Sequence, residues 1–235
     1  MARLAIGTAL VAALFGTAVA VADPSCTEDA IVVFDGSSSM SETEQGLGDQ
    51  PRIVLAREAI RRAMPEIAIS RRLGLVIYGP GSQRESCKNV DLRFPPIPNA
   101  APRIVADVDR LHPNGNTPLT AAVRAAAETL DFTQKPGVVV LVTDGRETCG
   151  ESPCALGTAL AAKAANLTVH VIGFQLQSDT NGHPSFRPAN VDYKADCLAK
   201  KTGGRVVTTE TVDELVAALR KTLACPLFSR LDQAG

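Results

Sequence analysis

Two acidic residues stand directly at the ends of apolar runs. Asp35 follows the run 30–34, and Asp144 follows the run 137–143. In an open α/β sheet, ligands bind at the carboxyl ends of the strands, at the point where the strand order reverses. If these two strands are neighbours at that point, both carboxylates face one small volume. Two like charges in such a volume are costly, and a bound cation is their natural counterweight.

Three hydroxyl side chains are placed to join the two carboxylates. Ser37 and Ser39 lie on the loop after the first strand, and Thr117 precedes a proline at a predicted helix start. Carboxylate, hydroxyl and water oxygens together form a ligand set that suits a hard divalent cation. The sequence therefore predicts a site for Mg²⁺, with Mn²⁺ or Ca²⁺ as alternatives. Its residues would be Asp35, Ser37, Ser39, Thr117 and Asp144.

Short apolar runs alternate with helical patterns, which is typical of a parallel sheet covered by helices on both faces. Strands are predicted at 30–34, 73–78, 90–94, 137–143, 167–174 and 205–208. Helices are predicted near 51–67, 104–111, 117–130, 154–165, 191–201 and 212–223. This order indicates one doubly wound, Rossmann-like α/β domain with a mostly parallel sheet. The run 90–94 is expected to pair back as an antiparallel edge strand.

Prolines set two of the expected boundaries. Pro65 is expected to break or kink the end of the first helix, because proline removes a helical hydrogen bond. Pro95 and Pro96 are expected to end the edge strand, because neither has a backbone N–H to donate to a sheet.

Residues 1–22 are expected to be a signal peptide rather than part of the fold. Arg3 precedes the uncharged apolar run 4–21, which ends in small residues that fit a cleavage site before Asp23. An uncleaved membrane anchor is the alternative interpretation. The mature protein would be a single domain, residues 23–235, in a periplasmic or secreted location. No later apolar run is long enough to cross a bilayer, so a channel or transporter is excluded.

The composition supports a buried core and argues against nucleic-acid binding. Hydrophobic residues make up 45% of the chain and charged residues only 21%. The formal net charge is -1, whereas a nucleic-acid binder normally carries a basic surplus or stripe. Aromatic residues make up 4%, so the core must be mainly aliphatic.

Together, the candidate metal ligands resemble a known motif. They comprise an Asp-x-Ser-x-Ser segment that begins at Asp35, Thr117 in a Gly-x-Thr-Pro-Leu setting, and Asp144 in a Thr-Asp-Gly setting. This set resembles the metal-ion-dependent adhesion site (MIDAS) of von Willebrand factor type A domains. The similarity covers nearly the whole mature chain, from about residue 31 to 223, which also implies that fold.

The resemblance implies a role for each ligand. Ser37 and Ser39 would bind the metal directly, and Thr117 would bind it directly or through water, depending on the affinity state. Asp35 and Asp144 would act largely through metal-bound waters. In this family a Glu or Asp side chain of a partner completes the coordination. The resemblance therefore implies an exported, metal-dependent protein-binding module, whose partner is an exported or surface protein that presents an acidic residue.

Two other classes of function stay open. The first is a structural scaffold whose metal only stabilises the fold. The second is a metal-dependent hydrolase, which the sequence does not favour. No Gly-x-Ser-x-Gly nucleophile motif occurs, and an aspartyl-phosphate enzyme would need a second acid where Ser37 stands. His170 lies in a predicted strand and is interpreted as a buried residue with a hydrogen-bond partner. We therefore expect a protein that is not an enzyme.

Six cysteines follow the leader, and an even count behind an export signal predicts disulfides. No pair has the Cys-x-x-Cys spacing that is typical of zinc sites. The resemblance places both ends of the domain together, and this implies a bond between Cys26 and Cys225.

The middle four cysteines allow two pairings. Cys149 and Cys154 flank a tight loop, which favours a local bridge between them and leaves Cys87 with Cys197. The exchanged arrangement, Cys87–Cys149 with Cys154–Cys197, is nearly as acceptable and stays open.

Five acidic residues fall in loops near the proposed site. They are Glu42, Glu44, Asp49, Glu147 and Glu151. The simple interpretation is solvated surface charge. The sharper hypothesis is an acidic rim that favours basic patches around the partner's carboxylate.

Overall fold

Residues 28–43, 50–81, 83–174 and 194–224 are described by the computed structural model. Six strands form one sheet in the order β3-β2-β1-β4-β5-β6. The strands are β1 Asp29–Asp35, β2 Leu73–Tyr78, β3 Val90–Ile97, β4 Pro136–Thr143, β5 Asn166–Phe174 and β6 Val206–Thr209. All neighbours are parallel except β2 and β3, which are antiparallel. The predicted doubly wound α/β fold with an antiparallel edge strand is confirmed.

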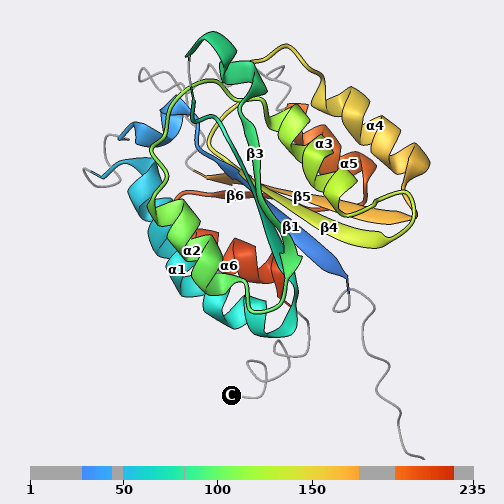
Figure 1. Ribbon diagram of the computed structural model, residues 1–235, viewed down its shortest axis with the longest axis horizontal. Helices are drawn as coiled ribbons and strands as arrows, with labels where there is room; N and C mark the ends of the chain where they lie inside the picture. The colour runs from blue at the N-terminus through green and yellow to red at the C-terminus, as the bar shows by residue number, and fades with distance from the viewer. Residues whose placement is uncertain (1–27, 44–49, 82, 175–193, 225–235) are drawn as a thin grey trace, which may run out of the picture.

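Helices cover both faces of the sheet (Figure 1). One face carries α1 Arg52–Ser70, α2 Ala101–Asp109 and α6 Val212–Leu223. The other carries α3 Leu119–Thr129, α4 Pro153–Lys163 and α5 Lys194–Lys201. Two short 3-10 helices, η2 Ser38–Ser41 and η3 Gln83–Lys88, lie in the connections after β1 and β2. In the described ranges, no helix combines the length and apolarity needed to cross a membrane.

Both proline boundaries differ from the prediction. The helix α1 continues through Pro65 to Ser70, so of the two expected effects, a break or a kink, the break is wrong. Pro65 itself is exposed, whereas Met64 and Ile67 beside it are buried, and this packing against the sheet holds the helix together across the missing hydrogen bond. The strand β3 likewise continues through its two prolines, which lie at a register irregularity in an edge strand, where proline is tolerated.

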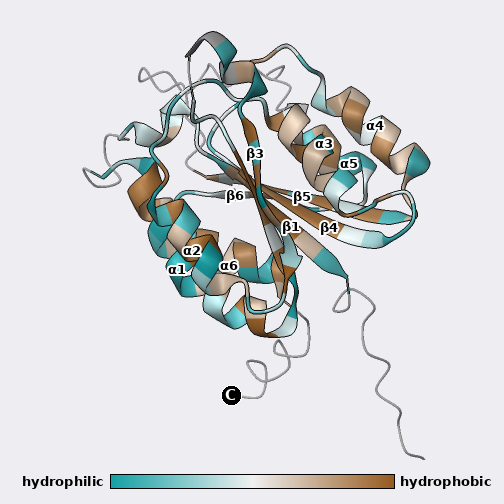
Figure 2. Cartoon of the chain, in the orientation of Figure 1, coloured by the Kyte–Doolittle hydropathy of each residue, from teal (hydrophilic) through white to brown (hydrophobic). Residues whose placement is uncertain are grey.

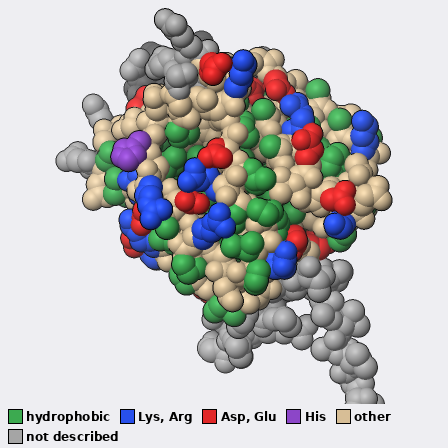
Figure 3. Space-filling model, in the orientation of Figure 1, with side chains coloured by type: hydrophobic (Ala, Val, Ile, Leu, Met, Phe, Trp, Pro, Cys, Tyr) green, Lys and Arg blue, Asp and Glu red, His purple; other side chains and the backbone are tan. Residues whose placement is uncertain are grey.

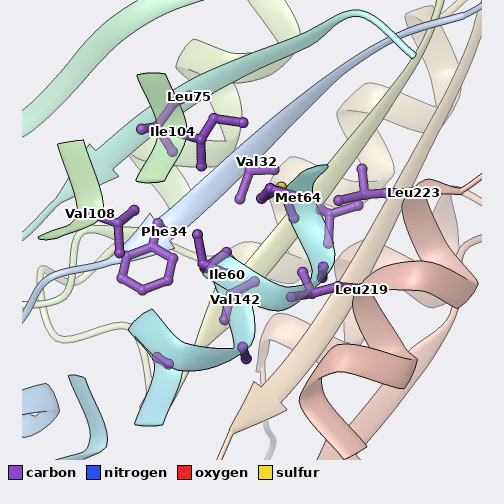
Figure 4. Close-up of a cluster of buried hydrophobic side chains, with 14 of the residues drawn as sticks. Val32, Phe34, Ile60, Met64, Leu75, Ile104, Val108, Val142, Leu219 and Leu223 are labelled. Atoms are coloured by element: carbon purple, nitrogen blue, oxygen red, sulfur yellow. The ribbon is translucent and has the colours of Figure 1, made fainter. Parts of the chain in front are cut away.

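The central strand β1 is buried on both faces. Val32 and Phe34 pack into one core cluster with side chains of α1, α2 and α6, as Figure 4 shows for Ile60 and Leu219 among others. The alternate residues of β1 belong to the second cluster, with α3 and α4. Figure 2 shows hydrophobic residues running along β1 and β4. Because β1 packs against both core clusters, the position of its last residue, Asp35, is fixed.

The register of the sheet brings the candidate residues to one edge. Phe34 of β1 pairs with Val142 of β4, and Asp35 pairs with Tyr78 of β2. The strand order reverses between β1 and β4, because β2 and β3 lie on one side and β5 and β6 on the other. Asp35 and Asp144 therefore leave the sheet side by side at the switch point, where ligands bind in such folds.

His170 in β5 has a hydrogen-bond partner, as predicted, but its side chain is half-buried rather than fully buried. Its Nδ1 accepts a hydrogen bond from the Arg205 backbone N–H at 2.9 Å. Burial, together with the positive charges of Arg205 and Arg71, lowers the pKa of His170 to about 4. The folded protein therefore holds this imidazole neutral down to acidic pH.

We predict that His170 makes the protein less stable in mild acid. Below a pH of about 6.5 the unfolded chain takes up a proton that the folded chain rejects, so stability falls as the pH drops from about 6.5 towards 4. His170→Asn keeps an acceptor for the Arg205 N–H and removes the titrating group. Thermal unfolding at pH 7.5 and pH 5 should show a smaller loss in this variant than in the wild type or in the exposed-site control His112→Asn. Equal losses in all three proteins would contradict the prediction.

Candidate metal centre

Asp35 is fully buried at the end of β1, and both of its carboxylate oxygens accept hydrogen bonds. Oδ2 accepts from the hydroxyls of Tyr78 and Thr143, each at 2.7 Å, and Oδ1 accepts from the Ser37 backbone N–H at 2.8 Å. Burial and the charge of Asp35 raise the pKa of Tyr78, which therefore stays protonated and donates. The carboxylate thus joins the ends of β1, β2 and β4.

A glycine allows the loops after β1 and β2 to meet. Gly79 has a φ of +106°, and a Cβ at this position would lie 2.5 Å from the Ser37 nitrogen. Only glycine fits such a close approach at a positive φ. The adjacent Gly36 N–H donates to the Tyr78 carbonyl at 2.9 Å, so the end of β2 holds the backbone that carries Ser37.

Ser37, Ser39 and Asp144 form a continuous chain of oxygen atoms. The hydroxyls of Ser37 and Ser39 lie 3.0 Å apart, and the Ser39 hydroxyl donates to Oδ1 of Asp144 at 2.7 Å. The 3-10 helix η2 positions Ser39, since the buried Met40 anchors this turn in the core and its N–H donates to the Ser37 carbonyl. The structure therefore brings these three predicted ligands together beside Asp35.

Asp144 is a buried carboxyl group whose charge is only partly compensated by its neighbours. Its side chain is buried, and burial followed by the charge of Asp35 raises its pKa to about 7, although Ser39 and Arg52 act in the opposite direction. Oδ2 is buried and accepts no hydrogen bond from the described part of the chain. A buried carboxylate in this condition favours a cation beside it.

Thr117 lies on the adjoining loop, before α3. The Thr117 N–H donates to the Thr148 hydroxyl at 2.8 Å, and the Thr148 N–H donates to the Thr117 carbonyl at 3.2 Å. The same loop joins the serine loop through the Ser38 N–H, which donates to the Gly115 carbonyl. Within the described ranges, the Thr117 hydroxyl makes no hydrogen bond to the other four predicted residues. Backbone hydrogen bonds therefore join the Thr117 loop to Thr148 and to the serine loop.

The donor set fits a hard divalent cation. It consists of neutral hydroxyl oxygens, from Ser37 and Ser39, together with a carboxylate oxygen of Asp144 that has no donor among the described residues. The described ranges contain no group of three or more His, Cys, Asp or Glu side chains that could hold a metal. A metal in this part of the chain therefore depends on the hydroxyls as well as the carboxylates.

Three functional neighbours were missed from the sequence. Tyr78 and Thr143 hold Asp35, and their positions at strand ends beside Asp35 were a usable signal. Arg52 is only 1% exposed, and its Nη1 donates to the Ser39 carbonyl at 3.0 Å. An arginine at a predicted helix start normally faces water, so the sequence pattern around Arg52 did not predict this contact.

The acidic residues near the site have individual partners. Glu147 accepts from the N–H groups of Thr120 at 2.9 Å and Cys149 at 2.7 Å, so it caps the start of α3. Glu151 pairs with Arg124, and Glu42 pairs with Arg52. The other two members of the hypothetical acidic rim, residues 44 and 49, lie outside the described residues. Acidic and basic side chains are interspersed over the face in Figure 3.

The disulfides correct the preferred pairing of the middle four cysteines. Cys87 is bonded to Cys149, and Cys154 is bonded to Cys197, so the exchanged arrangement is present and the pairs Cys149–Cys154 and Cys87–Cys197 are wrong. The reason lies in α4, which starts at the Ser152 cap and commits Cys154 to the helix face that packs on α5. Cys149 precedes that cap and faces η3. The predicted pair Cys26–Cys225 lies outside the described residues.

Comparisons with known proteins identify the family and the fold. A family model for the von Willebrand factor type A domain matches residues 30–147. The uncharacterised protein YwmD of Bacillus subtilis (strain 168) is 28% identical over 199 residues, which cover 81% of this chain and 82% of that protein.

Solved structures share the fold. The conserved hypothetical protein BatB from Bacteroides thetaiotaomicron has a TM-score of 0.59 at 18% identity, over 88% of this chain and 99% of that chain. Proximal thread matrix protein 1 from the mussel byssus, with a zinc-occupied MIDAS motif, has a TM-score of 0.55 at 20% identity, over 84% of this chain and 47% of that chain. At these identities the likeness shows the fold, and the site rests on the contacts described above.

We predict that the Cys87–Cys149 bond holds the Thr117 loop in place. The bond fixes the residue next to Thr148, which exchanges two hydrogen bonds with Thr117. Replacing both cysteines by serine should accelerate amide hydrogen exchange at Thr117 and Thr148 by about tenfold or more, because local opening becomes easier. Residue-resolved exchange measured by NMR gives these rates.

The matched control is the double serine variant of Cys154 and Cys197, which removes a disulfide on the α4–α5 side of the fold. This control should leave exchange at the two threonines close to that of the wild type. Equal acceleration in both double variants would mean a general loss of stability and would contradict a local role.

Proposed function

Because the chain belongs to the von Willebrand factor type A domain family, we propose that it is an exported, metal-dependent protein-binding module. The observation that carries this proposal is the buried Asp144 carboxylate, whose Oδ1 is joined to the Ser39 hydroxyl while Oδ2 lacks a hydrogen bond from the described residues. Burial without a full set of partners is costly, and a function that supplies a cation explains why the arrangement exists.

The metal that we propose is Mg²⁺, with Mn²⁺ or Ca²⁺ as alternatives. Asp144, Ser37, Ser39 and Thr117 would hold it. Asp35 would contribute its negative charge and hold the loops that carry these ligands. Oxygen atoms alone favour hard cations. The zinc in the mussel relative supports a divalent ion at the corresponding motif of that protein, although not a particular ion here. When bound, the cation supplies a positive, electron-accepting centre for an outside ligand.

The ligand chemistry indicates what the module would bind. Ser37 and Ser39 contribute neutral hydroxyls, and the Asp35 charge is already shared among three hydrogen-bond donors. A cation held mainly by neutral groups keeps most of its positive charge, so it attracts a carboxylate from outside. We therefore propose a partner that presents an exposed Asp or Glu side chain, on an exported or surface protein.

Export rests on the sequence and on the disulfides. The proposed leader, residues 1–22, lies outside the described residues, as does part of the proposed mature domain, residues 23–235. Two disulfide bonds are typical of an oxidising compartment, which fits a periplasmic or secreted location. We propose a coordinating role for the two serines, which contact each other and a carboxylate, and we propose no catalytic function because the chain has no Gly-x-Ser-x-Gly nucleophile motif.

Metal-dependent capture tests the function against the scaffold alternative. The immobilised protein is exposed to exported proteins of the source cells, in millimolar Mg²⁺ or in EDTA. The wild type should retain specific proteins only with Mg²⁺. Ser39→Ala should lose them, because it removes a direct ligand. Ser38→Ala should keep them, because this exposed neighbour contributes no side chain to the site. Prior conversion of the extract's carboxylates to amides should abolish retention.

Capture that is the same in Mg²⁺ and EDTA, or the same for the two serine variants, would contradict a binding role of the metal. If Mg²⁺ raised the melting temperature without any metal-dependent capture, the domain would be a scaffold whose metal only stabilises the fold.

A further inference from the structure

Arg52 is a charged side chain enclosed in the protein beside the proposed metal centre. It is the first residue of α1, and its side chain is only 2% exposed. Burying a guanidinium is costly unless nearby groups compensate its charge. The position of Arg52 therefore calls for an explanation in terms of its neighbours.

The contacts of Arg52 point to the metal loops. Its Nη1 donates to the Ser39 carbonyl at 3.0 Å and to Oε2 of Glu42 at 3.4 Å, and it lies 3.7 Å from Oδ2 of Asp144. The Glu42 side chain is 54% exposed, so water screens much of that pairing. The Asp144 side chain is 0% exposed, and its interaction with Arg52 is screened far less.

The backbone of Arg52 is also fixed at this point. The Arg52 N–H donates to the Glu42 carbonyl at 3.0 Å, and Thr43 and Pro51 form an isolated bridge beside it. The start of α1 is therefore tied to the end of the serine loop. The guanidinium has its place set by the same segment that carries Ser39.

Two carboxylates share this edge of the sheet, and they are satisfied differently. Asp35 accepts from two hydroxyls and one backbone N–H. Asp144 accepts from the Ser39 hydroxyl through one oxygen, and its other oxygen faces Arg52 beyond hydrogen-bond distance. An ion pair at 3.7 Å compensates charge without occupying that oxygen as a hydrogen bond would.

We propose that Arg52 is the built-in counter-ion of the metal centre: it neutralises Asp144 while the site is empty, and a bound divalent cation takes over that role. This inference rests on the proposed metal-binding function. Arg52 then has two opposite effects. It stabilises the metal-free protein, and it weakens metal binding, because the incoming cation is placed next to an existing positive charge. It is a positioning residue and not a ligand.

The test compares Arg52→Gln with the wild type, in EDTA and with saturating Mg²⁺ or Mn²⁺. Glutamine can still donate to the Ser39 carbonyl but carries no charge. In EDTA the melting temperature should fall by roughly 10 °C, because a buried carboxylate loses its counter-ion. Saturating metal should restore most of that loss. Calorimetric titration should give a metal Kd at least about tenfold lower in the variant, since the repulsion is gone.

Arg57→Gln is the matched control from the same helix. Arg57 donates to the backbone carbonyls of Val108 at 3.1 Å and of Leu111, so its role is structural. Its variant should lose the same stability in EDTA and in metal, with the Kd unchanged. If Arg52→Gln behaved like Arg57→Gln, or bound metal more weakly than the wild type, Arg52 would only hold the loop and the inference would be wrong.

A second comparison needs no metal. Asp144→Asn removes the charge that Arg52 neutralises, so the double variant Arg52→Gln/Asp144→Asn should melt higher in EDTA than Arg52→Gln alone. Additive losses would overturn the counter-ion role, even if Arg52→Gln alone folded too poorly to titrate. If the wild type bound no divalent cation, the proposed function would fail, while this cycle would still decide whether Arg52 and Asp144 are coupled.

Discussion

The buried carboxylate of Asp35 ties together the edge of the sheet on which the candidate site is built. Tyr78 from β2, Thr143 from β4 and the Ser37 N–H all donate to it. Hydrogen bonds to a charged group contribute about 1.5–3 kcal/mol each, and a charge left without them would be far more costly. The carboxylate therefore locks three strand ends into one arrangement. Asp35 acts mainly by holding the loops and by its charge.

That charge creates the chemistry of Asp144. Two carboxylates are brought side by side: three donors reach Asp35, whereas Asp144 accepts from the Ser39 hydroxyl through one oxygen only and is buried with a raised pKa. Its compensation can come from Arg52 within the protein or from a divalent cation outside it. The Cys87–Cys149 bond and the paired threonines 117 and 148 then hold the third loop beside the other two. The site therefore depends on one buried carboxylate that Arg52 compensates without donating a hydrogen bond to its Oδ2 atom.

Much of the fold and the position of the site could be predicted from the sequence. Uninterrupted apolar runs that end in Asp35 and Asp144 describe central strands of a doubly wound sheet, because only strands buried on both faces are apolar throughout. The spacing of Ser37 and Ser39 then placed two hydroxyls on the loop, where the structure joins them to Asp144. These features depend on residues that are close together in the sequence, so local sequence patterns predict them.

The features that were missed depend on packing between distant segments. Arg52 is buried because α1 starts against the serine loop, and no pattern around a proline and an arginine encodes that contact. The pairing of the middle cysteines depends on which face of α4 packs on α5. The prolines in α1 and β3 were overestimated as breaks, since burial of neighbouring side chains and an edge position both make proline tolerable.

The most direct test of the central claim is a titration of the EDTA-treated protein with Mn²⁺, followed by NMR of the backbone amides. Paramagnetic broadening marks the residues nearest the ion. The account predicts that the amides of Ser37, Ser39, Thr117 and Gly145 broaden first, that excess Mg²⁺ reverses the effect, and that Ser39→Ala weakens it while Ser38→Ala does not. Broadening centred elsewhere on the surface, or broadening indifferent to Ser39→Ala, would show that these three loops do not form a metal site.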